Sequence, residues 1–240
     1  MTRVRTTDQL TLVEHLAELR TRLIIALVAV AVGGVLVFTL YDVILGVILR
    51  PYEQVTGSNT LYIRSPLEGF AARLKVAVYG GLLLGSPVVL WEIWRFVTPG
   101  LRKSERRMAV PFMVASVSLF FGGAALAYFT FPQALGFLVA ISGNNVETLF
   151  SPIDYVTFWM KVVLAFGIAF EFPIMLVFLQ LVGVLTPRRL LGWWRWAIVG
   201  VFAAAAVITP SQDPITMLAM AVPMCVLYFG AIGVGKLLRR

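Results

Sequence analysis

Long apolar runs, separated by short polar stretches, dominate the sequence. The runs lie at about residues 24–41, 72–97, 108–131, 155–185, 193–208 and 215–234. A helix needs about 20 apolar residues to cross a bilayer. We therefore predict an all-α membrane protein with six transmembrane helices, in which residues 1–240 form a single polytopic domain. The last two runs are short, so this pair is expected to stand untilted or to thin the bilayer around it.

Two connections, residues 42–71 and 132–154, are predicted to form caps on the outer face of the membrane. The first apolar run continues to Leu49 and is expected to bend before Pro51 into a helix that lies on this face. An irregular loop should follow it. The second cap begins at Pro132 and contains the turn sequence Ser-Gly-Asn-Asn.

The N-terminal residues 1–23 are polar and lack the short apolar region of a cleavable signal, so the first run is expected to remain in the mature chain. An amphipathic helix, capped near Asp8, is predicted to lie at the membrane interface before the first span. Its apolar stripe would consist of Leu12, Leu16, Leu19 and Leu23.

Prolines and small residues inside the runs suggest bent, closely packed helices. Gly81-Leu-Leu-Leu-Gly85 has the small-xxx-small spacing that lets helix backbones approach each other. Prolines bend helices, and a set of bent helices would form a curved, concave wall. The prolines within the runs are Pro87, Pro111, Pro173 and Pro223.

Composition supports a membrane protein and excludes several other classes. Hydrophobic residues make up 60% of the chain and charged residues 13%, with a mean hydropathy of +0.90. These values exclude a soluble globular domain and a disordered tail. The single cysteine, Cys225, cannot form an internal disulfide. The net charge of +8 would suggest nucleic acid as a partner of a soluble protein, but in a membrane protein it bears on orientation.

The distribution of Lys and Arg predicts the orientation. Fifteen of the 20 basic residues fall in or beside the two termini and the connections between runs two and three and between runs four and five. Because cytoplasmic segments carry the excess of Lys and Arg, both termini are predicted to lie in the cytoplasm. The chain should therefore be a multi-pass protein of the cytoplasmic (inner) membrane.

Catalytic motifs are absent from the sequence. It has one histidine, His15, and no metalloprotease helix, nucleophile elbow, phosphate loop or cysteine pair. We predict no enzyme activity, no metal site and no cofactor. We expect the function of such a chain to be binding, gating or conduction.

Of the acids considered, Glu171 stands out, whereas Glu105 and Glu18 would not attract attention by themselves. Glu171 lies near the middle of the fourth run, where a carboxylate is costly and should face protein or trapped water. It is either a buried acid bonded to a neighbouring helix or a functional group. For Glu105, in a basic loop, and Glu18, one turn before Arg22, the simplest interpretation is local pairing with arginines.

Four stretches resemble motifs of the TatC family, the multispanning core of the twin-arginine protein translocase, and the likeness covers about residues 9–235. The first is His-Leu-Ala-Glu-Leu-Arg-Thr-Arg-Leu, and the second is the segment from Ser-Pro-Val-Val-Leu-Trp-Glu to Lys-Ser-Glu-Arg-Arg. The others are Phe-Gly-Ile-Ala-Phe-Glu-Phe-Pro and Ile-Thr-Pro-Ser-Gln-Asp-Pro. The four stretches begin at His15, Ser86, Phe166 and Ile208.

The resemblance implies a receptor for signal peptides that carry consecutive arginines on folded cargo proteins. It also implies that the chain assembles with the single-span subunits TatA and TatB and with other TatC copies. Export by this complex would be driven by the proton-motive force. The signal-binding patch implied by the motifs consists of Glu18, Phe96, Pro99, Leu101 and Glu105.

The resemblance also assigns positions within the membrane and on its outer side. Glu171 would face a groove, Pro51 would belong to the outer cap, and Thr209 and Asp213 would help dock a partner helix. One departure is Phe229, where the family often has an acid, so no role of that acid is carried over.

Arginine chemistry makes such recognition reasonable. A guanidinium binds a carboxylate through two parallel hydrogen bonds, which lysine cannot do. Two adjacent arginines would need two acids, and Glu18 and Glu105 come from separate segments. The loop cations Arg102, Lys103, Arg106 and Arg107 are expected to face anionic lipid headgroups. Two alternatives remain at this stage: a proton-coupled small-solute transporter that uses Glu171, and a structural membrane scaffold.

Overall fold

The structure, a computed structural model, describes residues 12–97, 108–143, 150–209 and 213–238. This part of the chain is helical, with short connections and no strand. The helices in chain order are α1 (Leu12–Thr39), α2 (Tyr41–Thr56), α3 (Glu68–Val97), α4 (Ala109–Ile141), α5 (Pro152–Ala169), α6 (Phe172–Leu181), α7 (Pro187–Gly192), α8 (Trp194–Ile208) and α9 (Pro214–Leu238).

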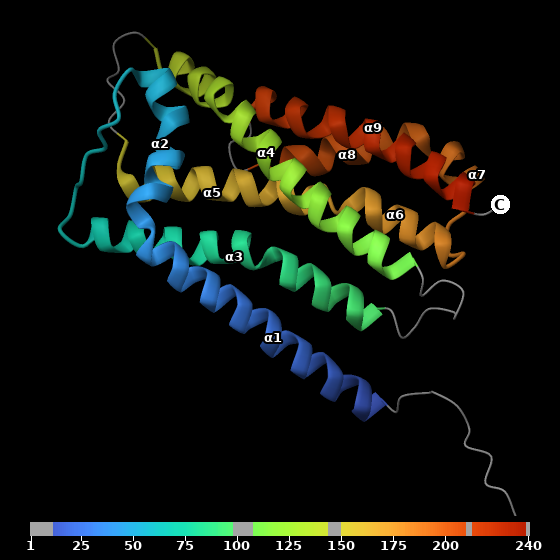
Figure 1. Cartoon of the computed structure of the whole chain (residues 1–240). Coiled ribbons are helices and arrows are strands. Elements are labelled where there is room, and N and C mark those ends of the chain that lie inside the picture. The colour runs from blue at the N-terminus through green and yellow to red at the C-terminus, as the bar shows by residue number, and fades with distance from the viewer. Residues whose placement is uncertain (1–11, 98–107, 144–149, 210–212, 239–240) are drawn as a thin grey trace, which may run out of the picture.

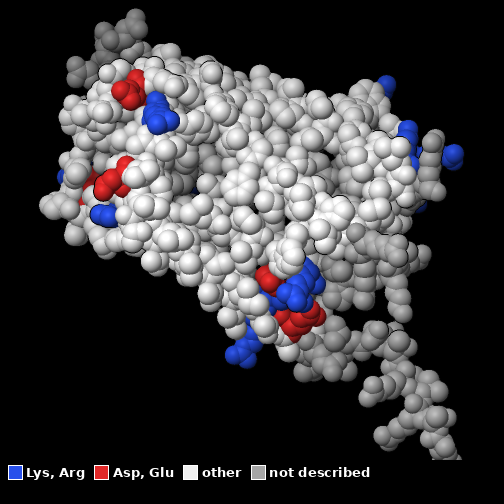
Figure 2. Space-filling view, viewed as in Figure 1, with Lys and Arg blue, Asp and Glu red and all other residues white. Residues whose placement is uncertain are grey.

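The predicted fold class is confirmed. Among the described residues, five segments are long and apolar enough to cross a membrane: His15–Thr39, Glu68–Val97, Ala109–Ile141, Pro152–Leu181 and Pro214–Leu238. The shorter apolar helix α8 corresponds to the fifth run. Charged side chains gather near the two ends of the face seen in Figure 2, and an uncharged band lies between them.

The expectation of two short final spans is right for α8 and wrong for α9. The 15 residues of α8 extend over roughly 22 Å, less than a hydrocarbon core of about 30 Å. Helix α9 has 25 residues because it continues through Lys236, well beyond the predicted end of its run.

The N-terminal amphipathic helix is not a separate interfacial element. In the described chain, α1 starts at Leu12 and continues without a break to Thr39. No helix breaker lies between the polar N-terminal part and the apolar run, so the helical hydrogen bonds continue. Leu16 and Leu23, on the predicted stripe, are 64% and 66% exposed. Asp8, the predicted cap, lies outside the described residues.

The first outer cap is more helical than predicted. The chain turns at Leu40, but α2 then runs through Pro51 to Thr56, and α3 already begins at Glu68. A proline inside a helix removes one backbone hydrogen bond. Here Pro51 and Tyr52 are buried, and packing offsets that loss. Helix α2 ends at Gly57, whose φ of 70° is the left-handed conformation that favours glycine.

Helix α4 also extends beyond its predicted end. It passes through Pro132 to Ile141, so most of the expected loop start is helix. Ala134 and Leu135 are 0% and 1% exposed, and this burial stabilises the extra turns. The prediction of a cap over 132–154 is therefore wrong in its first part.

The fourth apolar run contains a break. Helix α5 ends at Ala169 and α6 begins at Phe172, with Pro173 in its first turn. Proline is tolerated there because the first helical N–H groups have no partner within the helix. The predicted span is present as the segment Pro152–Leu181, but it consists of two successive helices with Phe170 and Glu171 between them.

Glycines allow α1 to pack closely along α3. A Cβ atom added to Gly81 would lie 2.6 Å from the backbone oxygen of Val30, and one added to Gly85 would lie 3.0 Å from the Val30 Cα. Only glycine fits at such an approach, as the small-xxx-small spacing predicts. Figure 1 shows α1 (blue) along α3 at one edge of the bundle and α8 and α9 (orange to red) at the other.

The main core surrounds α5, which packs against α3 and α4. Phe131, Tyr155 and Phe166 are among its fully buried side chains. The Tyr155 hydroxyl donates to the backbone oxygen of Ile48 at 2.8 Å, which ties the outer helix α2 to the start of α5. This contact fixes α2 relative to the bundle.

Candidate functional site

Two acids from different helices share one arginine where the N-terminal part of α1 meets the C-terminal part of α3. Arg22 Nε donates to Glu18 Oε1 at 3.0 Å, and Arg22 Nη2 donates to the same oxygen. Arg22 Nη1 donates to Glu92 Oε2 at 2.9 Å. We call these three residues the α1–α3 ion cluster. Two carboxylates against one guanidinium give it a net charge of −1.

The three side chains differ in exposure. The Glu92 side chain is 7% exposed, Arg22 is 15% and Glu18 is 23% exposed. Glu92 is therefore the most buried of the three side chains, and Glu18 is the most exposed. Buried charges require paired partners, and Arg22 supplies one for Glu92.

The second oxygen of Glu18 accepts no hydrogen bond within the described part of the chain. Glu18 Oε1 accepts both bonds from Arg22, whereas Glu18 Oε2 lies 4.0 Å from His15 Nδ1. The His15 ring stacks on Phe96, with ring centroids 4.4 Å apart and an angle of 18° between the planes. A hollow of about 420 Å³ opens beside the cluster, lined by Ala17, Glu18, Thr21, Arg22, Ile25 and Arg95.

A second group of polar atoms lies within the membrane span. The Ser116 hydroxyl of α4 donates to Glu171 Oε2, at the junction of α5 and α6. Glu171 Oε1 is buried and has no hydrogen-bond partner within the described part of the chain. An unpaired buried carboxyl oxygen is costly, so this position can accept a further hydrogen bond.

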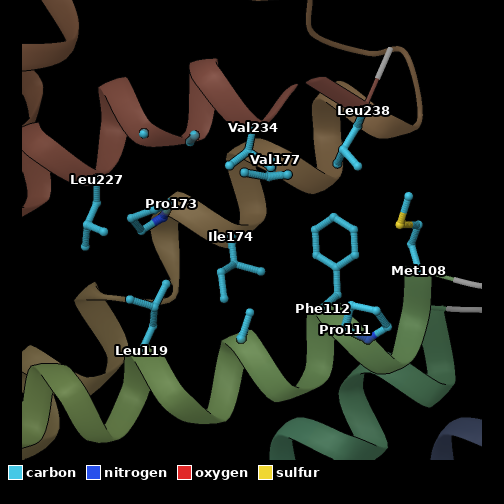
Figure 3. Close-up of a pocket in the computed structure, with 13 residues that line it drawn as sticks. Met108, Pro111, Phe112, Leu119, Pro173, Ile174, Val177, Leu227, Val234 and Leu238 are labelled. Atoms are coloured by element: carbon cyan, nitrogen blue, oxygen red, sulfur yellow. The ribbon is translucent and has the colours of Figure 1, made fainter. Parts of the chain in front are cut away.

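An apolar hollow of about 380 Å³ lies close to this junction, between α4, α6 and α9. Figure 3 shows Phe112 of α4, Ile174 and Val177 of α6 and Val234 of α9 around it. Glu171 precedes the lining residues Pro173 and Ile174 in the chain but does not itself line this hollow.

Two buried polar side chains, Thr209 and Asp213, lie at the end of α8 and just before α9. Thr209 and Asp213 are 1% and 2% exposed. Thr209 Oγ1 donates to the backbone oxygen of Ala205 at 2.8 Å, and Asp213 Oδ1 accepts from the Thr216 backbone N–H at 2.8 Å. Thr209 therefore stabilises the end of α8, and Asp213 caps the start of α9.

Metal chemistry has no support in the described ranges, where no group of three His, Cys, Asp or Glu side chains could hold an ion. The charged groups at this end of α1 and α3 include the acids Glu18 and Glu92 and the cations Arg22 and Arg95.

Comparison with known proteins identifies the family. A model of the family described as TatC, Sec-independent protein translocase protein, matches residues 14–223. The chain belongs to the TatC family. The TatC protein of Xylanimonas cellulosilytica is 39% identical over 92% of this chain and 82% of its own length. That of Aquifex aeolicus is 38% identical over 95% of this chain and 96% of its own length.

Solved structures agree with this assignment. A crystal structure of the twin-arginine translocase receptor TatC matches with a TM-score of 0.77 and 37% identity, covering 95% of this chain and all of that chain. A second, described as TatC in DDM, matches with a TM-score of 0.79 and 37% identity over 93% of this chain and 100% of that chain.

The resemblance found in the motifs is therefore confirmed. As a TatC protein the chain is a multi-pass membrane component of a protein translocase and not an enzyme. The small-solute transporter receives no support from these relatives.

The structure brings together part of the patch implied for TatC. Glu18 and Phe96 lie at the same end of the α1–α3 pair, linked through His15. The other patch residues, Pro99, Leu101 and Glu105, lie outside the described residues. The proposed pairing of Glu18 with Arg22 is present.

The sequence interpretation missed Glu92. It precedes Phe96 by four residues on α3, so both share one helix face. That spacing could have drawn attention to it. Its partner on α1 is 70 residues away, and no local pattern indicates such a pair.

Pro51, implied for the outer cap, is buried inside α2 at the opposite end of α1. Glu171 combines features of both its interpretations. The Ser116 bond is that of a buried acid tied to a neighbouring helix, while the free Oε1 leaves capacity for another donor.

Proposed function

We propose that this TatC protein is the receptor subunit that binds twin-arginine signal peptides of folded cargo. The observation that carries the proposal is Glu18 Oε2, which accepts no hydrogen bond from the residues that the structure describes and lies beside a hollow at one end of α1. A guanidinium can donate to that oxygen in a charge-assisted hydrogen bond. Solved relatives described as twin-arginine translocase receptors support the same role.

The second arginine of the signal requires a second acid, and we assign it to Glu105. This acid belongs to the segment between α3 and α4, which follows directly after Phe96 and Val97 at the same end of α3. Pro99 and Leu101 would shape the surface between the two acids. Paired acids on separate segments would explain why two consecutive arginines are needed.

The apolar part of the signal would then lie along the membrane-embedded wall toward Glu171. Assembly with TatA, TatB and other TatC copies is proposed for the remaining surfaces, with Thr209 and Asp213 at the turn that docks a partner helix. Anionic lipids would contact the basic segments. The excess of Lys and Arg at one end favours a cytoplasmic location for the Glu18 end and for both termini.

An export and crosslinking assay tests the receptor proposal. In cells that lack their own TatC, this chain should export a folded reporter with an Arg-Arg signal and fail with a Lys-Lys signal. Glu18→Gln and Glu105→Gln should each reduce signal crosslinking by about tenfold or more, because each loses a charge-assisted bond. The control is Glu53→Gln, an exposed acid on the outer helix α2. Unchanged crosslinking in both variants would reject the assignment.

A further inference from the structure

The geometry points to Glu92 as a positioning residue for signal recognition: its carboxylate balances the charge of Arg22, so that Arg22 does not cancel the negative charge that Glu18 offers to the incoming arginine. This inference rests on the proposed function. Glu92 would act through Arg22 without touching the peptide.

The first step concerns charge. Without Glu92, the pair of Glu18 and Arg22 would be neutral, because one guanidinium would satisfy one carboxylate. Arg95 also lines the hollow beside Glu18. Two cations would then face one acid, and the hollow would repel a cationic peptide. The charge of Glu92 removes this excess.

The second step concerns geometry. Arg22 directs Nε and Nη2 at Glu18 Oε1, and it directs Nη1 at Glu92 Oε2. The planar guanidinium is thereby fixed between two helices. Glu18 is held by one oxygen, and its other oxygen lies on the side of His15, 4.0 Å from Nδ1. The arrangement orients Glu18 while leaving a hydrogen-bond acceptor available.

The third step concerns access. Glu18 and Arg22 line the hollow, whereas Glu92 does not. The Glu92 side chain is only 7% exposed and meets the hollow through Arg22. This position fits a role through Arg22 better than direct contact with the signal.

The experiment measures binding of a fluorescent Arg-Arg signal peptide to the purified full chain in lipid nanodiscs. Glu92→Gln should weaken binding about tenfold, and Glu92→Asp, which keeps the charge, should recover much of it. The double variant Arg22→Gln with Glu92→Gln should also bind better than Glu92→Gln alone. The double variant also lacks the guanidinium of Arg22, which Glu92 balances in the native protein. The negative charge of Glu18 is then no longer offset by Arg22. Glu53→Gln is the matched control.

Thermal unfolding of each variant separates positioning from packing. A merely structural role predicts that binding falls in parallel with unfolding temperature and that the double variant is the worst of the set. That result would overturn the inference, as would wild-type binding by a folded Glu92→Gln protein. If Glu18→Gln loses binding while Glu92→Gln does not, the receptor proposal stands and this inference fails. If Glu18→Gln binds normally, both fail.

Discussion

At the scale of single residues, the sequence shows which acids are unusual but not which groups they meet. Glu171 is recognisable from its position in an apolar run, whereas Glu18 and Glu105 are singled out only by the resemblance to TatC motifs. The bonds that determine their state come from elsewhere in the chain: Ser116 lies 55 residues from Glu171, and Glu92 lies 70 residues from Arg22. Such contacts depend on how helices pair, which side-chain periodicity does not specify.

Ser116 provides a test at this scale. Ser116→Ala should destabilise the protein by about 1–3 kcal/mol, because Glu171 would lose its hydroxyl donor while its other oxygen already has no partner in the described structure. Unfolding in a mild detergent measures the change. The control is Ser142→Ala, whose exposed hydroxyl donates to the Leu138 backbone oxygen near the end of α4. Equal stability of the two variants would show that the Ser116 bond contributes little.

At the scale of elements, apolar length predicts that a span exists but not where its helix breaks or ends. The six runs are all helical, yet the fourth is divided at Glu171 and α4 extends through Pro132. Proline marks the start of a new helix at one of these places and is accommodated inside a continuous helix at the other. Pro173 lies in the first turn of a new helix, whereas Pro132 lies within one helix whose next turn is buried. Burial of neighbouring residues decides between these outcomes, and sequence spacing alone does not reveal it.

The pairing of α1 with α3 gives the prediction at this scale. Gly81→Ala should destabilise the protein by about 1–3 kcal/mol, because its Cβ would lie 2.6 Å from the Val30 backbone oxygen and α1 would have to move. A displacement of α1 should also weaken signal binding, because Glu18 lies on α1 and Glu92 lies on α3. Unfolding and peptide binding measure the two effects.

The matched control for that substitution is Gly122→Ala on α4. A Cβ atom there meets nothing within 4 Å, so the variant should keep both stability and binding. If Gly81→Ala behaves like Gly122→Ala, the close approach of α1 to α3 does not set the position of the ion cluster.

At the scale of the whole molecule, the chain direction and the distribution of charge determine which elements lie at each end of the bundle. An even number of spans brings both termini to one side, and the ion cluster lies at that same end of α1 and α3. The opposite end holds α2, and Arg73 of α3 contacts the corner where α1 ends. Its Nη2 donates to the Phe38 backbone oxygen at 3.0 Å, where α1 ends. The sequence predicts that the chain has two ends on opposite sides of the membrane. It does not predict the contact of Arg73 with the end of α1.

Orientation in the membrane is a prediction that labelling can test. In a Cys225→Ser background, Asn59→Cys on the outer loop should react in intact cells with a maleimide that does not cross membranes. Arg189→Cys on α7 should react only after the membrane is broken, because this end carries the basic excess. Arg189 is exposed, so a lack of labelling in intact cells would reflect its side of the membrane and not its burial.

The reverse labelling pattern would place Glu18 outside the cytoplasm. Signal peptides are made in the cytoplasm, so an outward Glu18 could not bind them before export, and the receptor proposal would fail with the orientation. The expected pattern leaves the Glu18 end facing newly made cargo, with the Arg22–Glu92 pair already in place to orient its carboxylate. Orientation, ion pairing and signal selectivity are thus linked through one end of α1, and each can be measured separately.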